Sequence, residues 1–217
     1  MAIVTIRGQS GSWAPEIGEA VAVNFHADYV DREIIAQVAS VLNKRPGEVA
    51  AKEESPVGLL GRVARALERG YPLSSTGSGA GGIDPAVYAP TWEIPLDDSQ
   101  YLSGLRSVIK ALASGGSIVV AGRGSQFILK DHPGALHVLV VAPLEIRVRR
   151  VMESHHLNEK TARKEIEHED SSRRQFIRQY FKAELWDPTH YDLVINSEHL
   201  SIEAAASIIA NAAMACR

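Results

Sequence analysis

The amino-acid sequence predicts an α/β protein built on a five-stranded parallel sheet flanked by helices. Short apolar runs rich in β-branched residues alternate with longer segments of helical periodicity, which is typical of such a sheet. The first of these runs leads directly into a glycine- and serine-rich turn and then a helix. At 217 residues, with 45% hydrophobic and 23% charged residues, the chain suits one globular domain that carries an insertion.

Five short apolar segments are predicted to form the strands. They are residues 2–6, 28–30, 117–121, 136–141 and 192–195. Between them, residues 101–113 place aliphatic side chains on one stripe and end before Gly115 and Gly116, which predicts a helix. Pro143 is expected to open the next helix, and Ser201 to cap the alanine-rich last helix.

Two regions interrupt this alternation. Residues 36–100 contain a helix-like segment and then a glycine- and serine-rich stretch at 74–82, which predicts an inserted helical subdomain with a loop. Residues 153–185 are highly charged and predict a helical hairpin, in which Asn158 caps one helix and apolar residues within 176–181 stripe the next. Both regions follow the carboxyl ends of strands, where open α/β sheets bind ligands.

The turn after the first strand has the order of a phosphate-binding loop. Gly8-Gln9-Ser10-Gly11-Ser12 precedes a helix whose first turn suits Pro15. Backbone N–H groups and a helix N-terminus can hold an anion without a side chain, so we predict phosphate binding over residues 8–14, Trp13 and Ala14 included. An ordinary strand-to-helix turn is the alternative. Counted from Gly8, the P-loop pattern G-x-x-x-x-G-K-[ST] would need its second glycine at Trp13, its lysine at Ala14 and its hydroxyl at Pro15.

Charged residues follow two other predicted strands. Asp31 and Arg32 come after the second strand, where a surface ion pair at a helix start is the alternative interpretation. Arg123 follows the third strand between Gly122 and Gly124. Glycines there let the backbone approach a ligand while the guanidinium binds phosphate or carboxylate.

The segment from 145 to 182 carries an excess of Lys and Arg over Asp and Glu, and its arginines include Arg147 and Arg173. Phosphoryl transfer needs cations around charge that is spread over several oxygens, and an arginine-rich mobile lid would supply them while excluding water. For any single arginine, a solvated face with salt bridges is the alternative. That alternative is weakest for Asp170-x-x-Arg173, where the hairpin returns toward the core.

In combination, these segments resemble the nucleoside monophosphate kinases, and most closely the cytidylate kinase-like family. The resemblance covers nearly the whole chain. It rests on residues 29–35, 119–129 (VVAGRGSQFIL) and 142–152 (APLEIRVRRVM), on Asp170-x-x-Arg173, and on 186–188 with 191–196. It implies a single P-loop kinase-like domain over residues 1–217, with an acceptor-binding insertion at 36–100 and a lid at 153–185.

The same resemblance implies roles for individual residues. Gly8 to Ser12 would hold the phosphates of the donor, with ATP and Mg²⁺ as cofactors. Asp31 and Arg32 would lie near the acceptor nucleotide, and Arg123 would bind its phosphate. The residues expected to take part in catalysis are Arg123, Arg147 and Arg173.

The loop departs from the family pattern. Typical cytidylate kinases continue glycine, lysine, glycine, threonine where this chain has Trp13, Ala14, Pro15 and Glu16, and Gly124 stands where an acid often follows the arginine. Removing one preorganised electrostatic stabiliser typically costs about a hundred- to a thousand-fold in rate. Trp13 could stack on a base or fill the space left by the lysine, and the sequence leaves both open.

The leading hypothesis is therefore a kinase-like protein that transfers phosphate from ATP to a small acceptor, with a pyrimidine nucleoside monophosphate as the candidate. The rival is a nucleotide-binding or regulatory protein that keeps the fold without the chemistry. A net charge of −3 argues against a nucleic-acid polymer as ligand. No signal peptide or membrane-spanning stretch is found, so we expect a cytoplasmic monomer or homodimer without a metal site built from its histidines.

Overall fold

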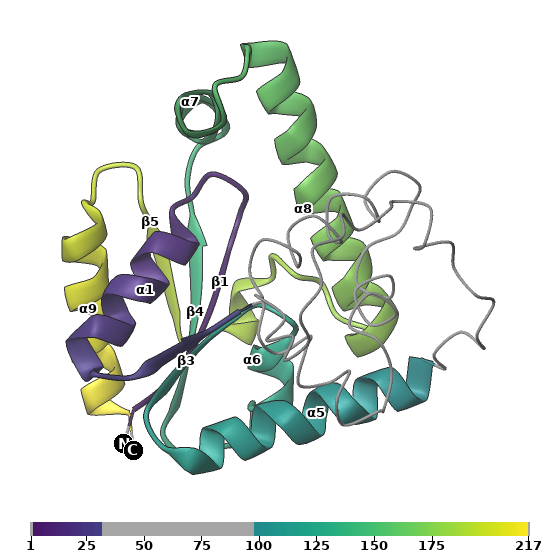
Figure 1. Ribbon diagram of the computed structural model, residues 1–217, viewed down its shortest axis with the longest axis vertical. Helices are drawn as coiled ribbons and strands as arrows, with labels where there is room; N and C mark the ends of the chain where they lie inside the picture. The colour runs from purple at the N-terminus through teal and green to yellow at the C-terminus, as the bar shows by residue number, and fades with distance from the viewer. Residues whose placement is uncertain (1, 32–97, 217) are drawn as a thin grey trace, which may run out of the picture.

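The computed structural model describes residues 2–31 and 98–216. Predictions for the insertion up to residue 97, and for Arg32, lie outside the described residues. Residues 98–100, which the sequence assigned to the insertion, belong instead to a helix of the core (Figure 1).

Five parallel strands form one sheet, in the order β2-β3-β1-β4-β5. They are β1 (Ile3–Gly8), β2 (Asp28–Val30), β3 (Ile118–Ala121), β4 (Ala135–Val141) and β5 (Leu193–Asn196). The predicted fold class and all five predicted strands are confirmed, with ends that shift by two residues at most. The largest shift is in β1, which runs on through Arg7 to Gly8.

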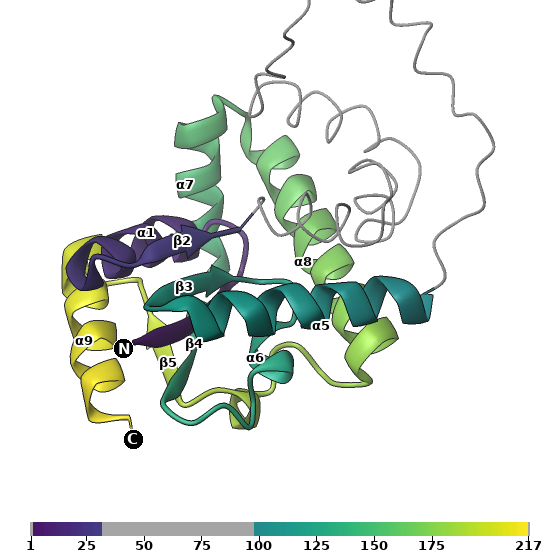
Figure 2. The same ribbon diagram turned by 60° about the horizontal axis from the view of Figure 1, so that its bottom comes forward.

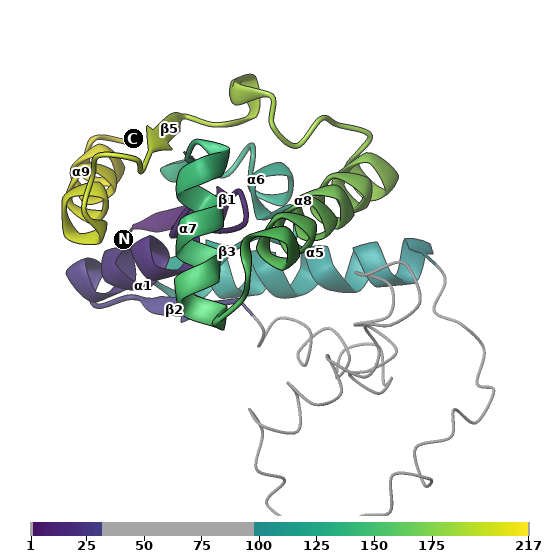
Figure 3. The same cartoon turned by 90° about the horizontal axis from the view of Figure 1, so that it is seen from above.

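Helices cover both faces of the sheet, as Figures 2 and 3 show. They are α1 (Ala14–Phe25), α5 (Asp98–Gly115), α6 (Ser125–Ile128), α7 (Leu144–His155), α8 (Glu159–Phe181), α9 (Ile202–Ala215) and the short 3₁₀ helix η2 (Pro188–His190). α1 and α9 pack side by side on one face, and α5 and α8 lie on the other. Within the described part of the chain, no helix is both long enough and apolar enough to cross a membrane.

Strand alternation divides the core into two clusters. Val4 and Ile6 of β1 pack with α1 and α9, whereas Ile3 packs on the opposite face with α5. On that second face the fully buried Tyr101 contacts the rings of Phe176 and Tyr180, which fixes the C-terminal half of α8 to the core. Because side chains alternate along a strand, Arg7 projects to the same face as Ile3.

The predicted hairpin within 153–185 is wrong in one respect. A single helix, α8, runs from the Asn158 cap to Phe181, where the sequence analysis expected two helices. Neither glycine nor proline occurs between residues 159 and 181, so nothing in the sequence breaks the helix. The predicted caps are confirmed, because the Asn158 side chain accepts from the Thr161 N–H and Ser201 from the Ala204 N–H.

Parallel pairing brings the loops after β1 and β3 to the same edge of the sheet. The Gly122 N–H donates to the Ile6 carbonyl at 3.0 Å, one residue beyond the paired strands. Gly124 then adopts φ +68° with the Phe181 ring directly against its Cα, so that a Cβ here would lie 2.2 Å from Cε2 of that ring. Close packing against α8 thus explains why the position holds a glycine and not the acid of the family pattern.

We predict that Gly124→Ala destabilises the fold much more than Gly134→Ala. Both glycines have positive φ, but nothing lies within 4 Å of a Cβ built at Gly134. Each substitution should lower the free energy of unfolding by about 1–2 kcal/mol, because alanine disfavours the left-handed backbone conformation. At residue 124 only, overpacking against Phe181 should lower it by about 1–3 kcal/mol more. Denaturant unfolding of both variants measures the difference, and equal losses would contradict the packing explanation.

Candidate active site

A cavity of about 580 Å³ opens at the carboxyl ends of β1, β2 and β3, between the start of α1 and the helices α7 and α8. Most of the predicted site residues line it. They are Gly8, Gln9, Ser10, Gly11, Trp13, Ala14, Asp31, Arg123 and Arg173. Ser12, which is fully buried, and Arg147 do not line it.

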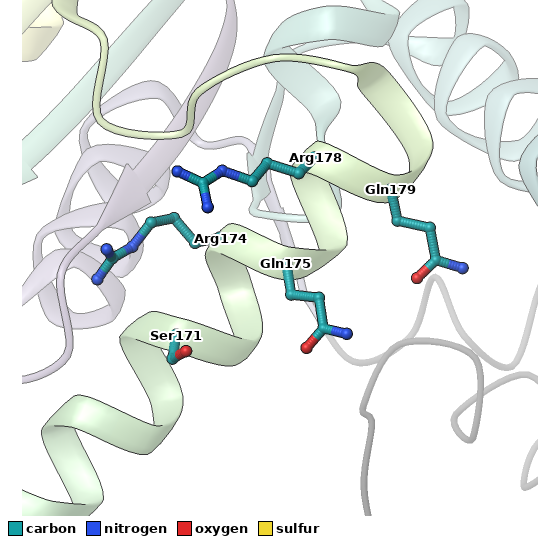
Figure 4. A pocket seen from close by; sticks show the side chains of 5 residues that line it. All are labelled: Ser171, Arg174, Gln175, Arg178 and Gln179. Atoms are coloured by element: carbon teal, nitrogen blue, oxygen red, sulfur yellow. The ribbon is translucent and has the colours of Figure 1, made fainter.

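A second, more open hollow of about 390 Å³ runs along α8. Figure 4 shows its five lining residues, which all project from this one helix: Ser171, Arg174, Gln175, Arg178 and Gln179. No strand end or loop of the described sheet contributes to it. The larger cavity is therefore the candidate site, because there several elements converge on one space.

The loop between β1 and α1 leaves backbone donors available at the start of the helix. Across the described residues, no acceptor is found for the N–H groups of Gly11, Trp13 and Ala14. Gly11 has φ +77°, and a Cβ on it would lie 2.7 Å from the Arg147 carbonyl oxygen, so only glycine lets the loop pass this close to α7. Free N–H groups at a helix N-terminus are suited to an anion.

Trp13 takes the left-handed conformation that a glycine would supply at this place in a P-loop, with φ +65°. The Arg150 guanidinium lies 3.4 Å above the centre of its ring, a cation–π contact. Arg150 also donates to the Ser197 Oγ at 2.9 Å and to the Ser197 carbonyl at 2.7 Å. The indole side chain is thus held against α7, which favours the space-filling role for Trp13 over stacking on a base.

A buried carboxylate of α8 binds the middle of the loop between β1 and α1. Asp170 accepts from the Ser10 N–H at 2.9 Å with one oxygen and from Arg147 at 2.7 Å with the other. Arg147 also donates to the carbonyls of Ser10 and Ala142, and it is only 7% exposed. Glu169 adds a bond from the Ser10 hydroxyl at 2.8 Å. Arg147 therefore points at the back of the loop, and one loop N–H is already bound to a carboxylate.

Two of the three arginines predicted to take part in catalysis line the cavity. Arg173 donates to the Gly8 carbonyl at 3.3 Å and to Glu169 at 3.0 Å, which places it at the beginning of the loop. Arg123 lies at the end of β3 in a left-handed conformation, with φ +56° between two glycines that also have positive φ. Non-glycine residues in this region are strained by about 1–3 kcal/mol and cluster at functional sites.

Sequence reasoning missed Arg7, whose half-buried side chain also lines the cavity. Burial lowers the pKa of its guanidinium, and the nearby charges of Arg173 and Arg123 lower it further, while Tyr191 and Asp31 raise it. The sequence did carry a signal, because a cation ends an otherwise apolar strand directly before Gly8. The predicted strand stopped at Ile6, so Arg7 was assigned to neither strand nor loop.

The residues present fit the phosphates of a nucleotide better than they fit the usual magnesium site. Free N–H groups and four arginine side chains line one space, whereas the hydroxyl that holds Mg²⁺ in a P-loop is replaced by Pro15. No cluster of three metal-binding side chains is found among the described residues. The carboxylates of Glu16 and Asp31 do line the cavity, and Mg²⁺ is often bound by one or two carboxylates together with substrate phosphates.

Comparison with known proteins decides the family. Residues 3–199 match the model of the cytidylate kinase-like family, which is most of the chain. The chain belongs to this family. A solved structure of an uncharacterized protein from Eubacterium ventriosum shares the fold, with a TM-score of 0.67 at 17% identity over 99% of both chains.

Curated relatives of this cytidylate kinase-like protein match only in part. It is 28% identical to a cytidylate kinase from Staphylothermus marinus over 125 residues, which is 57% of this chain and 64% of the relative. It is 32% identical to a uronate isomerase from Corynebacterium glutamicum over 132 residues, which is 59% of this chain and 24% of the relative. The chain thus spans less than two thirds of the length of either relative.

We predict that Arg147→Met strongly destabilises the protein, because it leaves Asp170 charged and buried without its partner. The free energy of unfolding should fall by about 3–5 kcal/mol. Arg163→Met is the matched control on α8, since Arg163 pairs with Glu145 and Glu159 at the surface and such pairs contribute about 1 kcal/mol or less. Denaturant unfolding compares the two, and similar losses would show that the buried pair does not hold the loop.

Proposed function

We propose that this protein binds a nucleotide through its phosphates in the 580 Å³ cavity and transfers the terminal phosphoryl group of ATP to a small acceptor. One observation carries the proposal. Arginines from β1, from the loop after β3 and from α8 line the same cavity as the free N–H groups at the start of α1. Cations around a phosphoryl group, together with positioning, are most of what phosphoryl transfer requires of a protein.

The proposed division of roles follows the geometry. The N–H groups of Gly11, Trp13 and Ala14 would hold the donor phosphates, and Arg173 would approach them from α8. An acceptor oxygen forms a bond to the γ-phosphorus while the bond from that phosphorus to the bridging oxygen of ADP breaks. Magnesium, when bound, would neutralise phosphate charge, with Glu16 and Asp31 as its candidate protein ligands. Arg147 acts as a positioning residue behind the loop.

A pyrimidine nucleoside monophosphate is the proposed acceptor. The match to a cytidylate kinase from Staphylothermus marinus supports this choice. In this proposal Arg123, at the end of β3, binds the acceptor's phosphate, and Asp31, after the end of β2, lines the same cavity. Arg32 follows Asp31 in the sequence, and its proposed role near the acceptor nucleotide rests on the family resemblance alone.

A second candidate function is nucleotide binding without turnover. It is favoured by the bond between the Ser10 N–H and Asp170, which takes one loop donor away from a phosphate. Because Ala14 and Pro15 stand where a P-loop has its lysine and its hydroxyl residue, two electrostatic contributions to catalysis are absent from the loop. Each such contribution is typically worth about a hundred- to a thousand-fold in rate. The two candidates differ in turnover and not in where the nucleotide binds.

We expect ATP to be converted to ADP in a coupled assay only when a monophosphate acceptor is present, and fastest with CMP or UMP from a panel of nucleoside monophosphates. Calorimetric titration with ATP runs in parallel. Binding of ATP without acceptor-dependent turnover would support the second candidate. Absence of both binding and turnover would reject both proposals.

Arg123 gives a residue-level test of the acceptor site. Arg123→Ala should weaken binding of CMP by about 2–4 kcal/mol, and Arg123→Lys by less, because lysine keeps the charge but loses the planar fork. Arg178→Ala is the control, because it removes the same charge from the exposed face of α8. If CMP binds the Arg123→Ala variant unchanged while the variant melts at a lower temperature, Arg123 is structural.

A further inference from the structure

The Arg7 guanidinium has no bound partner within residues 2–31 and 98–216. Among the residues that the structure describes, none forms a hydrogen bond or an ion pair with it, and its Nε is buried without an acceptor. Asp31 lies near enough for its charge to act on Arg7 but forms no ion pair with it. A partly buried cation without a directly bound counterion destabilises a protein, since its lost hydration is only partly compensated. This differs from Arg147 and Arg150, whose guanidinium groups are both bound to protein acceptors.

Backbone geometry directs Arg7 to the space between the loop and β3. Its Nη1 lies 2.6 Å from the position that a Cβ on Gly122 would occupy, so the glycine makes room for the guanidinium. Arg173 and Arg123 are close enough for their charges to act on it, and both line the same cavity. Asp31 acts on Arg7 in the opposite sense, and Glu169 pairs with Arg173. Guanidinium groups from three separate elements nevertheless meet at one space, which suits a ligand that carries several negative charges.

Arg7 is also placed between the two ends of the proposed reaction. On one side, Arg173 contacts the Gly8 carbonyl at the start of the donor loop. On the other side, Arg123 follows β3, where the acceptor phosphate would bind. The lysine of a P-loop would reach the β- and γ-phosphates from the start of the helix, but Ala14 has no such side chain.

We propose that Arg7 binds the phosphoryl group being transferred, and so takes the place of the missing P-loop lysine from the sheet side of the loop. The inference rests on the proposed function, because it needs ATP in this cavity. A guanidinium suits the task, since its planar donors can contact two phosphate oxygens at once. The cation that contacts the transferred group would then come from the second-last residue of β1, and not from the start of the first helix as it does in a P-loop.

This role predicts opposite effects on stability and on binding. Arg7→Met removes a cation that burial and two neighbouring arginines disfavour, and it keeps an apolar stem, so the ligand-free variant should melt at a higher temperature than the wild type. Its affinity for ATP should fall by roughly 30-fold or more, the range for losing one partner of a buried charge pair. Affinity for ADP, which lacks the transferred group, should change much less. Arg7→Lys should lose less ATP affinity than Arg7→Met.

Calorimetric titration of ATP and of ADP into the wild type, Arg7→Met and Arg7→Lys tests the proposal, together with melting curves of the ligand-free proteins. Arg149→Met is the control for net charge, because Arg149 is exposed on α7 and does not line the cavity. A selective loss of ATP affinity in Arg7→Met, with a raised melting temperature and an unchanged control, supports the proposal.

The contrary outcomes separate this inference from the proposed function. If the wild type binds ATP and Arg7→Met binds it equally well, the inference fails and the proposed function stands. Equal losses for ATP and ADP would place Arg7 on another phosphate and also overturn it. A lowered melting temperature or failure to fold in Arg7→Met would show a structural role. If the wild type binds neither nucleotide, the proposed function fails and the inference with it.

Discussion

The arrangement of the site depends on the Asp170 carboxylate, which bridges the Ser10 N–H and the Arg147 guanidinium. These three residues come from the loop after β1, from α7 and from α8, so one buried ion pair fixes three elements relative to one another. A buried pair of this kind is strongly disfavoured when either partner is missing. It therefore limits the positions that the loop can take while α8 stays packed on Tyr101.

The arginines of the site differ in where they lie and in what they bind. Arg147 and Arg150 are buried and bound to carboxylate, hydroxyl, carbonyl or indole groups of the protein, although Arg150 also lines the cavity. Arg7, Arg123 and Arg173 line the cavity as well, and of these Arg173 is bound to Glu169 and to the Gly8 carbonyl. Arg147 and Arg150 hold the loop backbone in place, and the guanidinium groups that line the cavity face it together with carboxylates such as those of Asp31 and Glu169. A high arginine content alone would not reveal these differences, because they depend on which face of α7, α8 or β1 each side chain occupies.

Trp13 shows how the fold tolerates a side chain where a P-loop has glycine. The left-handed backbone at this residue is unfavourable for any residue with a Cβ, by roughly 1–2 kcal/mol. Contact with Arg150, itself fixed by Ser197, supplies a compensating attraction. The loop thereby keeps a helix N-terminus with free N–H groups although its lysine and hydroxyl are absent.

The sequence by itself determined the layers of this protein and the position of its loop. Apolar runs, caps such as Asn158 and Ser201, and a glycine-rich turn are local signals, and local signals fix where strands and helices begin and end. Only the tertiary structure decided which charges face the cavity. Arg147 lies behind the loop, whereas Arg7 lines the cavity together with Arg123 and Arg173. Strand register and helix packing bring together residues that are more than a hundred positions apart in the sequence. No local pattern records such a contact, since a single sequence shows the order of charges along the chain and not their distances in space.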